Sequence, residues 1–258
     1  MIRNSFIFLS GFGERRERRL WESGILSWED FLEKERIKGI PERRKPLLDM
    51  EIKEAKLNLE LRIPHFFAYR MPRREHWRLY EEFRHSACFL DIETTGLSPA
   101  RGEVTLVGMY DGREYKAFIK GINLNEEVLK RELEKHSILV TFYGTGFDVP
   151  FLKARFPSIG LEKPNIDLCF ASRRLGLSGG LKRIEEILGL EREDGIKGMD
   201  GFDAVRLWKR WEIYHDKASL ETLIEYNRAD VVNLKPLAEH IYSKLKGKSF
   251  NTVLKAGR

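Results

Sequence analysis

The nine residues from Phe89 to Leu97, FLDIETTGL, constrain this chain more than any other stretch. Asp91 and Glu93 follow an apolar run that is typical of a buried strand. Residues two apart on a strand share a face, so both carboxylates project together while Ile92 points the opposite way. Two such acids repel each other unless a cation lies between them, and Mg²⁺ prefers oxygen ligands. The stretch therefore predicts a metal site, although an exposed edge strand with alternating charges would give the same pattern.

Composition limits the classes of protein to which the chain can belong. Its 258 residues are 42% hydrophobic, which supports a sizeable core, and 33% charged, which argues against a membrane protein. No apolar run approaches the roughly 20 residues that span a bilayer. The start of the chain carries no small-residue cleavage site, so we reject a signal peptide and expect a cytoplasmic protein.

Net charge and cysteine usage indicate which partners and which kinds of site to expect. The net charge of +6 suits a polyanionic partner, although basic solvated surfaces are common. Cys88 and Cys169 both lie in apolar, strand-like contexts. They are expected to be buried thiols and not a disulfide framework or a zinc site.

Residues 1–62 are predicted to form an all-helical region. Gly11 and Gly13 form a tight turn before a helix that ends at Gly24, and Ser27 is the expected N-cap of the next helix. This pattern resembles a helix-hairpin-helix element, whose backbone amides meet a nucleic-acid phosphate. The positive charge near it comes from Arg15, Arg16, Arg18 and Arg19. The alternative is a small helical cap that only packs on the main domain.

Residues 63–85 are interpreted as a connector that is rich in aromatic and basic residues. Such a segment can stack on bases and hold a nucleic-acid backbone. It can equally be a hydrophobic strap with its aromatic rings buried, and this is the interpretation we favour. The rings concerned are Phe66, Phe67, Trp77 and Tyr80.

From Ser86 onward, strand patterns alternate with helix patterns. The first strand is followed by a hairpin that closes through Asp111 and Gly112. A further strand is predicted within 137–144, a short strand passing into a helix within 165–175, and helices within 125–136, 147–156, 179–190, 201–215 and 220–245. Three antiparallel strands followed by alternating helices and strands predict an α/β fold with a mixed five-stranded sheet flanked by helices.

Two further acidic motifs fall where the first pair would need additional ligands. Asp148 lies just past a strand, at the start of a helix whose dipole favours a negative charge. Tyr226 and Asp230 lie four apart on a helix and therefore on one face. Asp148 taken alone could be an ordinary N-terminal helix acid, and Asp230 a solvated helix residue. The three motifs in this order are much harder to explain in that way.

The three motifs FLDIETTGL, FDVPFL and YNRADVVNL resemble those of the DEDD superfamily of DnaQ-like 3′→5′ exonucleases. The third motif resembles that of the DEDDy branch, because it carries a tyrosine, Tyr226, where the other branch carries His. The closest resemblance is to YprB-like proteins, especially archaeal single-strand-specific 3′→5′ exonucleases, and it extends to the GFGERRERRLWESGILSWEDFL opening and to EHWRLYEEF. One departure concerns Tyr143, because these families usually carry Asn at that turn.

This resemblance implies a ribonuclease H-like fold and two divalent ions, Mg²⁺ or Mn²⁺, roughly 3.5–4 Å apart. Asp91 would bridge both ions, and Glu93 and Asp230 would hold the ion that activates water. Asp148 would support the second ion, partly through water. Tyr226 would orient the attacking water, since its ordinary pKa of about 10 makes it a poor base.

The resemblance also implies contacts with the terminal nucleotide. Leu97 would wedge against its base, backbone groups near Thr94 would meet its 3′ hydroxyl, and Phe147 is a second candidate for base contact. Plain core packing is the alternative for Leu97 and Phe147. The expected substrate-binding set is Thr94, Thr95, Gly96, Leu97 and Phe147.

A few polar residues outside the motifs have more ordinary interpretations. Asp167 and Asp203 lie at element ends, where they could shape the site but are expected to cap helices. Lys182 and Arg183 follow two glycines at a helix start, a geometry that could receive a phosphate. We expect them to form a solvated helix end.

These observations favour a metal-dependent exonuclease that releases nucleotides from the 3′ end of single-stranded DNA. The alternatives are the same chemistry on RNA, or a non-catalytic nucleic-acid-binding protein with a decayed nuclease site. The intact acids argue against decay, because clustered carboxylates repel phosphate. The expected domains are 1–62 (helical), 63–85 (connector) and 86–258 (ribonuclease H-like), and a homo-oligomer is left open.

Overall fold

The computed structural model describes residues 1–254, with side chains described up to residue 249. The chain divides into two compact units. The first comprises Met1–Arg84 together with the residues from Tyr242 onward, and the second comprises His85–Ile241. Among the described residues, no helix is both long enough and apolar enough to span a membrane.

The first unit is helical, as predicted for its N-terminal part. Its elements up to Arg84 are η1 (Ile2–Asn4), α1 (Glu14–Glu22), α2 (Trp28–Glu33), η2 (Glu42–Arg44), α3 (Lys45–Glu60), α4 (His65–Arg70), η3 (Arg73–Leu79) and α5 (Tyr80–Phe83). Gly11 adopts φ +75° in the turn before α1, and Gly24 adopts φ +82° after it. Ser27 caps α2 through a capping box with Asp30. These local features confirm the predicted turn, helix stop and N-cap.

Aromatic side chains build the core of this unit. The four connector rings predicted for a strap, those of Phe66, Phe67, Trp77 and Tyr80, are all buried. Buried rings cannot stack on bases, so base stacking by these four residues is excluded. A buried ion pair joins Arg78 to Glu17 at 2.9 Å. Such a pair is tolerated in a core because its charges are mutually compensated and hydrogen-bonded.

The second unit contains a five-stranded mixed sheet in the order β3-β2-β1-β4-β5. The strands are β1 (Ala87–Thr94), β2 (Val104–Tyr110), β3 (Tyr115–Ile119), β4 (Ile138–Thr141) and β5 (Asn165–Asp167). β1 lies in the centre, antiparallel to β2 and parallel to β4. The predicted mixed α/β sheet, including the hairpin between β2 and β3, is confirmed.

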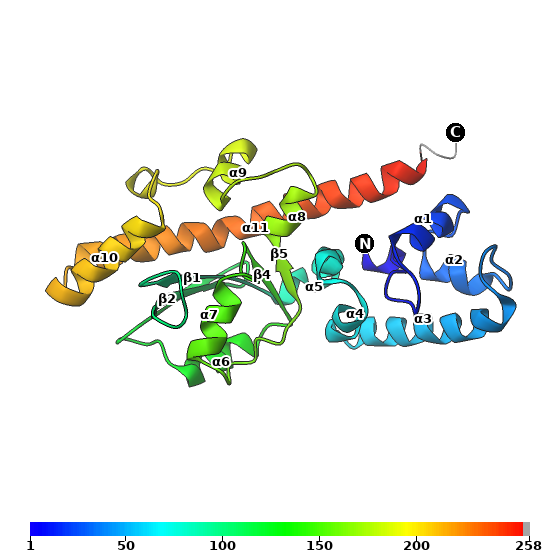
Figure 1. Ribbon diagram of the computed structural model, residues 1–258, viewed down its shortest axis with the longest axis horizontal. Coiled ribbons are helices and arrows are strands. Elements are labelled where there is room, and N and C mark those ends of the chain that lie inside the picture. Colours follow the sequence, from blue (N-terminus) through cyan, green and yellow to red (C-terminus); the bar gives the residue numbers. More distant parts are fainter. Residues whose placement is uncertain (255–258) are drawn as a thin grey trace. The chain divides into compact units, whose positions relative to one another are not determined.

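Helices cover both faces of this sheet (Figure 1). The helices that follow Arg84 in the chain order are α6 (Glu126–Leu133), α7 (Asp148–Arg155), α8 (Leu168–Arg173), α9 (Leu181–Leu188), α10 (Gly201–Tyr214) and α11 (Lys217–Leu254), with η4 (Arg84–Ser86) and η5 (Asp194–Ile196) as short turns. α6 and α7 pack on one face, where Leu90 and Ile92 join their core. α10 and α11 pack on the opposite face, around Leu106 and Trp208. Because successive side chains of β1 point to opposite faces of the sheet, Asp91 and Glu93 point toward the face that carries α11.

The last helix differs from its predicted bounds of 220–245, because α11 begins at Lys217 and continues to Leu254. Asp216 explains the early start. Its carboxylate accepts hydrogen bonds from the backbone N–H of Ser219 at 3.4 Å and from the Ser219 hydroxyl at 2.7 Å, so it caps the first turn. At the other end, Gly247 does not stop the helix.

Candidate active site

The two carboxylates of the first motif project from the same face of β1, as predicted. Ile92 points the other way and is buried in the core under α6 and α7. Asp91 and Glu93 meet Asp230 of α11, and one ligand oxygen from each of the three lies within 4.8 Å of the others. Residues separated by more than 130 positions in the chain thus form one oxygen-rich cluster.

Asp148 stands at the edge of this cluster, in the first turn of α7. Its Oδ1 accepts a hydrogen bond from the backbone N–H of Ile92 at 3.1 Å, which ties the carboxylate to β1. Its negative charge also raises the pKa of Asp91, second only to burial. All four predicted acids therefore lie together at one end of the sheet.

Burial and mutual repulsion act on these acids in the same direction. Burial raises the pKa of Glu93 to about 8, and Asp230 adds repulsion. Burial also raises the pKa of Asp148 to about 7. The pKa of Asp91 lies well above its usual range because of burial and the charges of its three acidic neighbours. Without a bound cation, the cluster is thus held partly protonated at neutral pH.

A single arginine from the segment after α9 compensates part of this charge, and sequence reasoning missed it. The guanidinium of Arg192 pairs with Asp230 and also with Glu185, the latter at 2.6 Å. Its side chain is only 7% exposed. No sequence signal marks it, because the pairing joins a loop to α11.

Asn227 is a second residue that sequence reasoning missed. Its side-chain amide donates to Asp91 at 2.9 Å and to Glu93 at 3.2 Å, and its Oδ1 accepts from the Tyr115 hydroxyl at 2.9 Å. The bond to Tyr115 holds the other end of the amide, away from the acids. Asn227 lies three positions before Asp230 on α11, so the helical spacing of the third motif could have revealed it.

Lys182 corrects one expectation, because it is not part of a solvated helix end. Its ammonium donates to the hydroxyl of Tyr226 at 2.9 Å and also contacts the carbonyl of Met199. It lies 4.6 Å from the centroid of the Tyr226 ring. Its neighbour Arg183 is exposed and pairs within its own helix, at 3.1 Å from Glu186. Burial keeps the pKa of Tyr226 well above its ordinary value, so the phenol remains protonated.

A cavity of about 530 Å³ opens beside the acids. Its lining includes Thr94, Thr95, Gly96, Leu97 and Phe147. Leu97 is 83% exposed, so the alternative of core packing is wrong for this residue. Phe147 is half-buried, with its ring centroid 5.2 Å from that of Phe151, and it both packs on the core and faces the cavity.

The two additional aspartates cap helices, as expected. Asp203 completes a capping box with Asp200 at the start of α10. Asp167 caps α8 and also accepts hydrogen bonds from the backbone N–H groups of Tyr143 and Thr145, at 2.9 and 3.0 Å. Asp167 therefore shapes the turn that precedes Asp148 as well as the helix that follows it.

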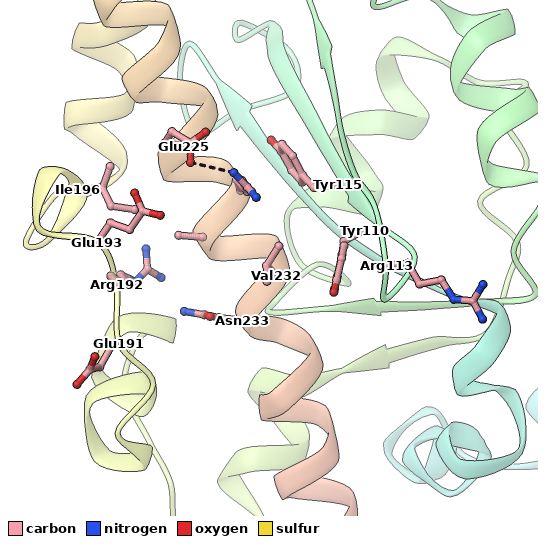
Figure 2. A pocket seen from close by; sticks show the side chains of 12 residues that line it. Tyr110, Arg113, Tyr115, Glu191, Arg192, Glu193, Ile196, Glu225, Val232 and Asn233 are labelled. Atoms are coloured by element: carbon pink, nitrogen blue, oxygen red, sulfur yellow. Dashed lines mark hydrogen bonds and ion pairs between the residues drawn. The ribbon is translucent and has the colours of Figure 1, made fainter.

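A second, smaller cavity of about 310 Å³ lies beside α11. Figure 2 shows Arg192 and Glu193 on the segment after α9, facing α11, while Tyr110 and Tyr115 lie on the sheet side. Its lining carries three arginines and three glutamates, so neither charge dominates. Through Arg192 and Tyr115 this cavity borders the residues that hold Asp230 and Asn227.

The donor set at the first cavity fits a hard divalent cation. Its ligand atoms are carboxylate oxygens, which suit Mg²⁺ or Mn²⁺ better than softer metals. Burial and mutual repulsion raise the pKa values of Asp91 and Glu93, and a bound cation would oppose both effects. Asp91, Glu93 and Asp230 could hold such an ion.

Comparison with known proteins agrees with the fold. The family model of the RNase H superfamily matches residues 88–242, so the chain belongs to this superfamily. No curated protein matches the sequence.

Solved structures that are similar to this chain include the family B DNA polymerase from the hyperthermophilic archaeon Pyrobaculum calidifontis. It is 19% identical with a TM-score of 0.50, over 66% of this chain and 26% of the polymerase, so this chain spans about a quarter of that protein's length. Brucella melitensis NrnC with bound Mg²⁺ is 20% identical with a TM-score of 0.48, over 69% of this chain and 81% of NrnC. The Aedes aegypti Nibbler EXO domain is 10% identical with a TM-score of 0.46, over 71% of this chain and 91% of that domain.

Proposed function

We propose that this protein is a metal-dependent 3′→5′ exonuclease that hydrolyses single-stranded DNA and releases nucleoside monophosphates. The observation that carries the proposal is the convergence of Asp91, Glu93 and Asp230 beside Tyr226 in one cavity. A binding protein gains nothing from buried acids that repel phosphate, whereas a hydrolase can use them to hold cations. Together with the three sequence motifs, this favours the DEDDy branch and the YprB-like group.

The four acids and Tyr226 each have a role in this proposal. Asp91, Glu93 and Asp230 would hold Mg²⁺ or Mn²⁺, with Asp148 supporting a second ion. When bound, such ions supply an activated water and stabilise charge on the phosphoryl oxygens. Tyr226 stays protonated, so its hydroxyl orients the water by hydrogen bonding and does not act as a base.

The cavity rim would receive the terminal nucleotide. Leu97 offers an exposed apolar side chain for its base, and Phe147 an aromatic ring. The Thr94 hydroxyl donates to the carbonyl of Gly96 at 2.7 Å, which shapes the backbone that would meet the 3′ hydroxyl.

End-labelled oligonucleotides test the activity directly. Release of mononucleotides from the 3′ end of single strands is expected with Mg²⁺ or Mn²⁺ and not with EDTA. Asp91→Ala should abolish release while circular dichroism shows an intact fold, and Glu127→Ala, an exposed acid on α6, serves as the control. Normal turnover by Asp91→Ala would refute the assignment. Matched DNA and RNA oligomers, single- and double-stranded, determine the sugar and strand preference.

We further propose the domain boundaries 1–62, 63–85 and 86–258, with the hairpin at Gly11 as a phosphate-binding element. The four arginines near it are all exposed: Arg15, Arg16, Arg18 and Arg19. Replacing Arg15 and Arg18 by Gln should reduce the dependence of binding on salt. The log–log slope should fall by about 0.7 for each single-strand phosphate that the variant no longer neutralises. An unchanged slope would favour a purely structural cap.

A further inference from the structure

The turn between β4 and α7 holds a side chain in an unusual backbone conformation. Tyr143 has φ +62°, in the left-handed region that bulky residues rarely adopt. Asn adopts this region more readily than Tyr, because the short polar side chain of Asn can form hydrogen bonds with the nearby backbone. A strained conformation that persists points to a use for the side chain.

The surrounding residues hold the Tyr143 ring in a defined place. The backbone N–H of Tyr143 donates to Asp167 at 2.9 Å. A Cβ built on Gly146 would lie 2.7 Å from Cζ of the Tyr143 ring, so the ring rests directly against that glycine. The side chain is nevertheless 47% exposed and lines the cavity beside the acids. It is a preorganised aromatic surface at the cavity rim.

The aromatic surface continues beyond the rim onto α8. The Phe170 ring lies 6.1 Å from the Tyr143 ring, centroid to centroid, and is 41% exposed. The guanidinium of Arg173, also exposed, lies over the Phe170 ring at 5.4 Å. Tyr143, Phe170 and Arg173 therefore form a short track of two rings and one cation that leads away from the acids. Below we call these three residues the aromatic track.

We propose that the aromatic track binds the bases of a single strand just upstream of its 3′-terminal nucleotide. Exposed rings beside an arginine are the chemistry with which proteins hold single strands, because every base offers a face for stacking. The acids attract phosphate only through cations, whereas the track can contribute affinity without them. A paired base cannot expose its face in this way, so the track would favour single strands. This inference rests on the proposed function, because the track would hold the strand whose 3′ end enters the cavity.

Equilibrium binding tests the track independently of hydrolysis. Fluorescence anisotropy with a labelled dodecathymidylate is measured in EDTA, where no hydrolysis is expected. Phe170→Ala and Tyr143→Ala should each weaken binding about tenfold. Tyr214→Ala removes a ring that is 75% exposed at the end of α10, and it should leave affinity unchanged. None of these three substitutions should change the affinity for a blunt duplex.

Two substitutions at one position separate stacking from backbone strain. Tyr143→Asn should leave resistance to urea unchanged or raise it, while weakening binding as Tyr143→Ala does. Tyr143→Phe keeps the ring and should retain full affinity. Loss of affinity in Tyr143→Phe as well would overturn stacking as the cause.

The outcomes distinguish this inference from the proposed function. Full affinity of Phe170→Ala and Tyr143→Ala for the dodecamer overturns the track, whatever the nuclease activity. If these variants bind more weakly and the unsubstituted protein releases no nucleotides, the aromatic track is supported and the exonuclease activity is refuted. Failure of the unsubstituted protein to bind the dodecamer overturns the track.

Discussion

Gly108 leaves room for the amide that holds the two acids of β1. A Cβ built on Gly108 would lie 1.8 Å from Oδ1 of Asn227, so only glycine fits under this side chain. Gly108 is also the β2 residue paired with Asp91 in the sheet. The same close approach thus joins the centre of the sheet to α11.

Gly108→Ala should therefore displace Asn227 and loosen both carboxylates. Residues that orient metal ligands typically contribute about 10- to 100-fold to metal affinity, and we expect a loss of that size for Mn²⁺, measured by titration calorimetry. Overpacking should also lower the free energy of unfolding by about 1–3 kcal/mol. Asn227→Ala should lose similar Mn²⁺ affinity without the crowding. Native affinity in both variants would contradict a positioning role for the amide.

The stability of the metal-free protein should fall as pH rises. Glu93 and Asp148 have folded-state pKa values of about 8 and about 7, above their ordinary values of 4.5 and 3.8. Between these limits the folded state binds more protons than the unfolded state, so the free energy of unfolding decreases from about pH 4 to about pH 8. Thermal melts in EDTA across this range measure the slope.

Two additions sharpen this pH test. Mg²⁺ or Mn²⁺ should flatten the slope, because a cation favours the ionised acids. Asp91→Asn removes one repelling charge and should flatten it too, whereas Glu127→Gln on the exposed face of α6 should not. A metal-free protein that becomes more stable between pH 5 and pH 8 would contradict the buried, uncompensated cluster.

Lys182 and Tyr226 should act as one unit in turnover. Because the ammonium donates to the phenol at 2.9 Å, Lys182→Met frees the ring that orients the water. We expect kcat to fall about tenfold, the effect of removing one hydrogen bond to a charged group. The double variant Lys182→Met/Tyr226→Phe should lose no more than Tyr226→Phe alone. Arg183→Met is the matched control. If the losses of kcat in the two single variants add up in the double variant, Lys182 and Tyr226 act independently.

Arg192 should be important for stability in the absence of metal. Removing it leaves Glu185, which is 1% exposed, without its cationic partner. Arg192→Met should lower the free energy of unfolding by about 3–5 kcal/mol, as breaking a buried ion pair does, measured by urea denaturation in EDTA. Mn²⁺ should restore part of the loss, since it would supply positive charge beside Asp230. An unaltered urea midpoint would show that the pair contributes nothing.

Local sequence patterns determined most elements of the second unit. Alternation around Asp91 predicted which way Ile92 would point, and the helix predicted within 125–136 is observed as α6. Such features depend on residues a few positions apart, whose geometry is set by strand and helix periodicity. For the same reason, the spacing of Tyr226 and Asp230 was sufficient to place both on one face of α11.

Only the tertiary structure decided which distant side chains meet. The sequence contained Lys182 and Arg192 but gave no means of pairing them with Tyr226 and Asp230. Those pairings depend on how α9, its following loop and α11 pack on the sheet, and packing sums many weak contacts that no short motif records. Exposure was likewise a tertiary outcome. Leu97 and Tyr143 are open to solvent because their turns end strands at the cavity, while the connector rings are buried.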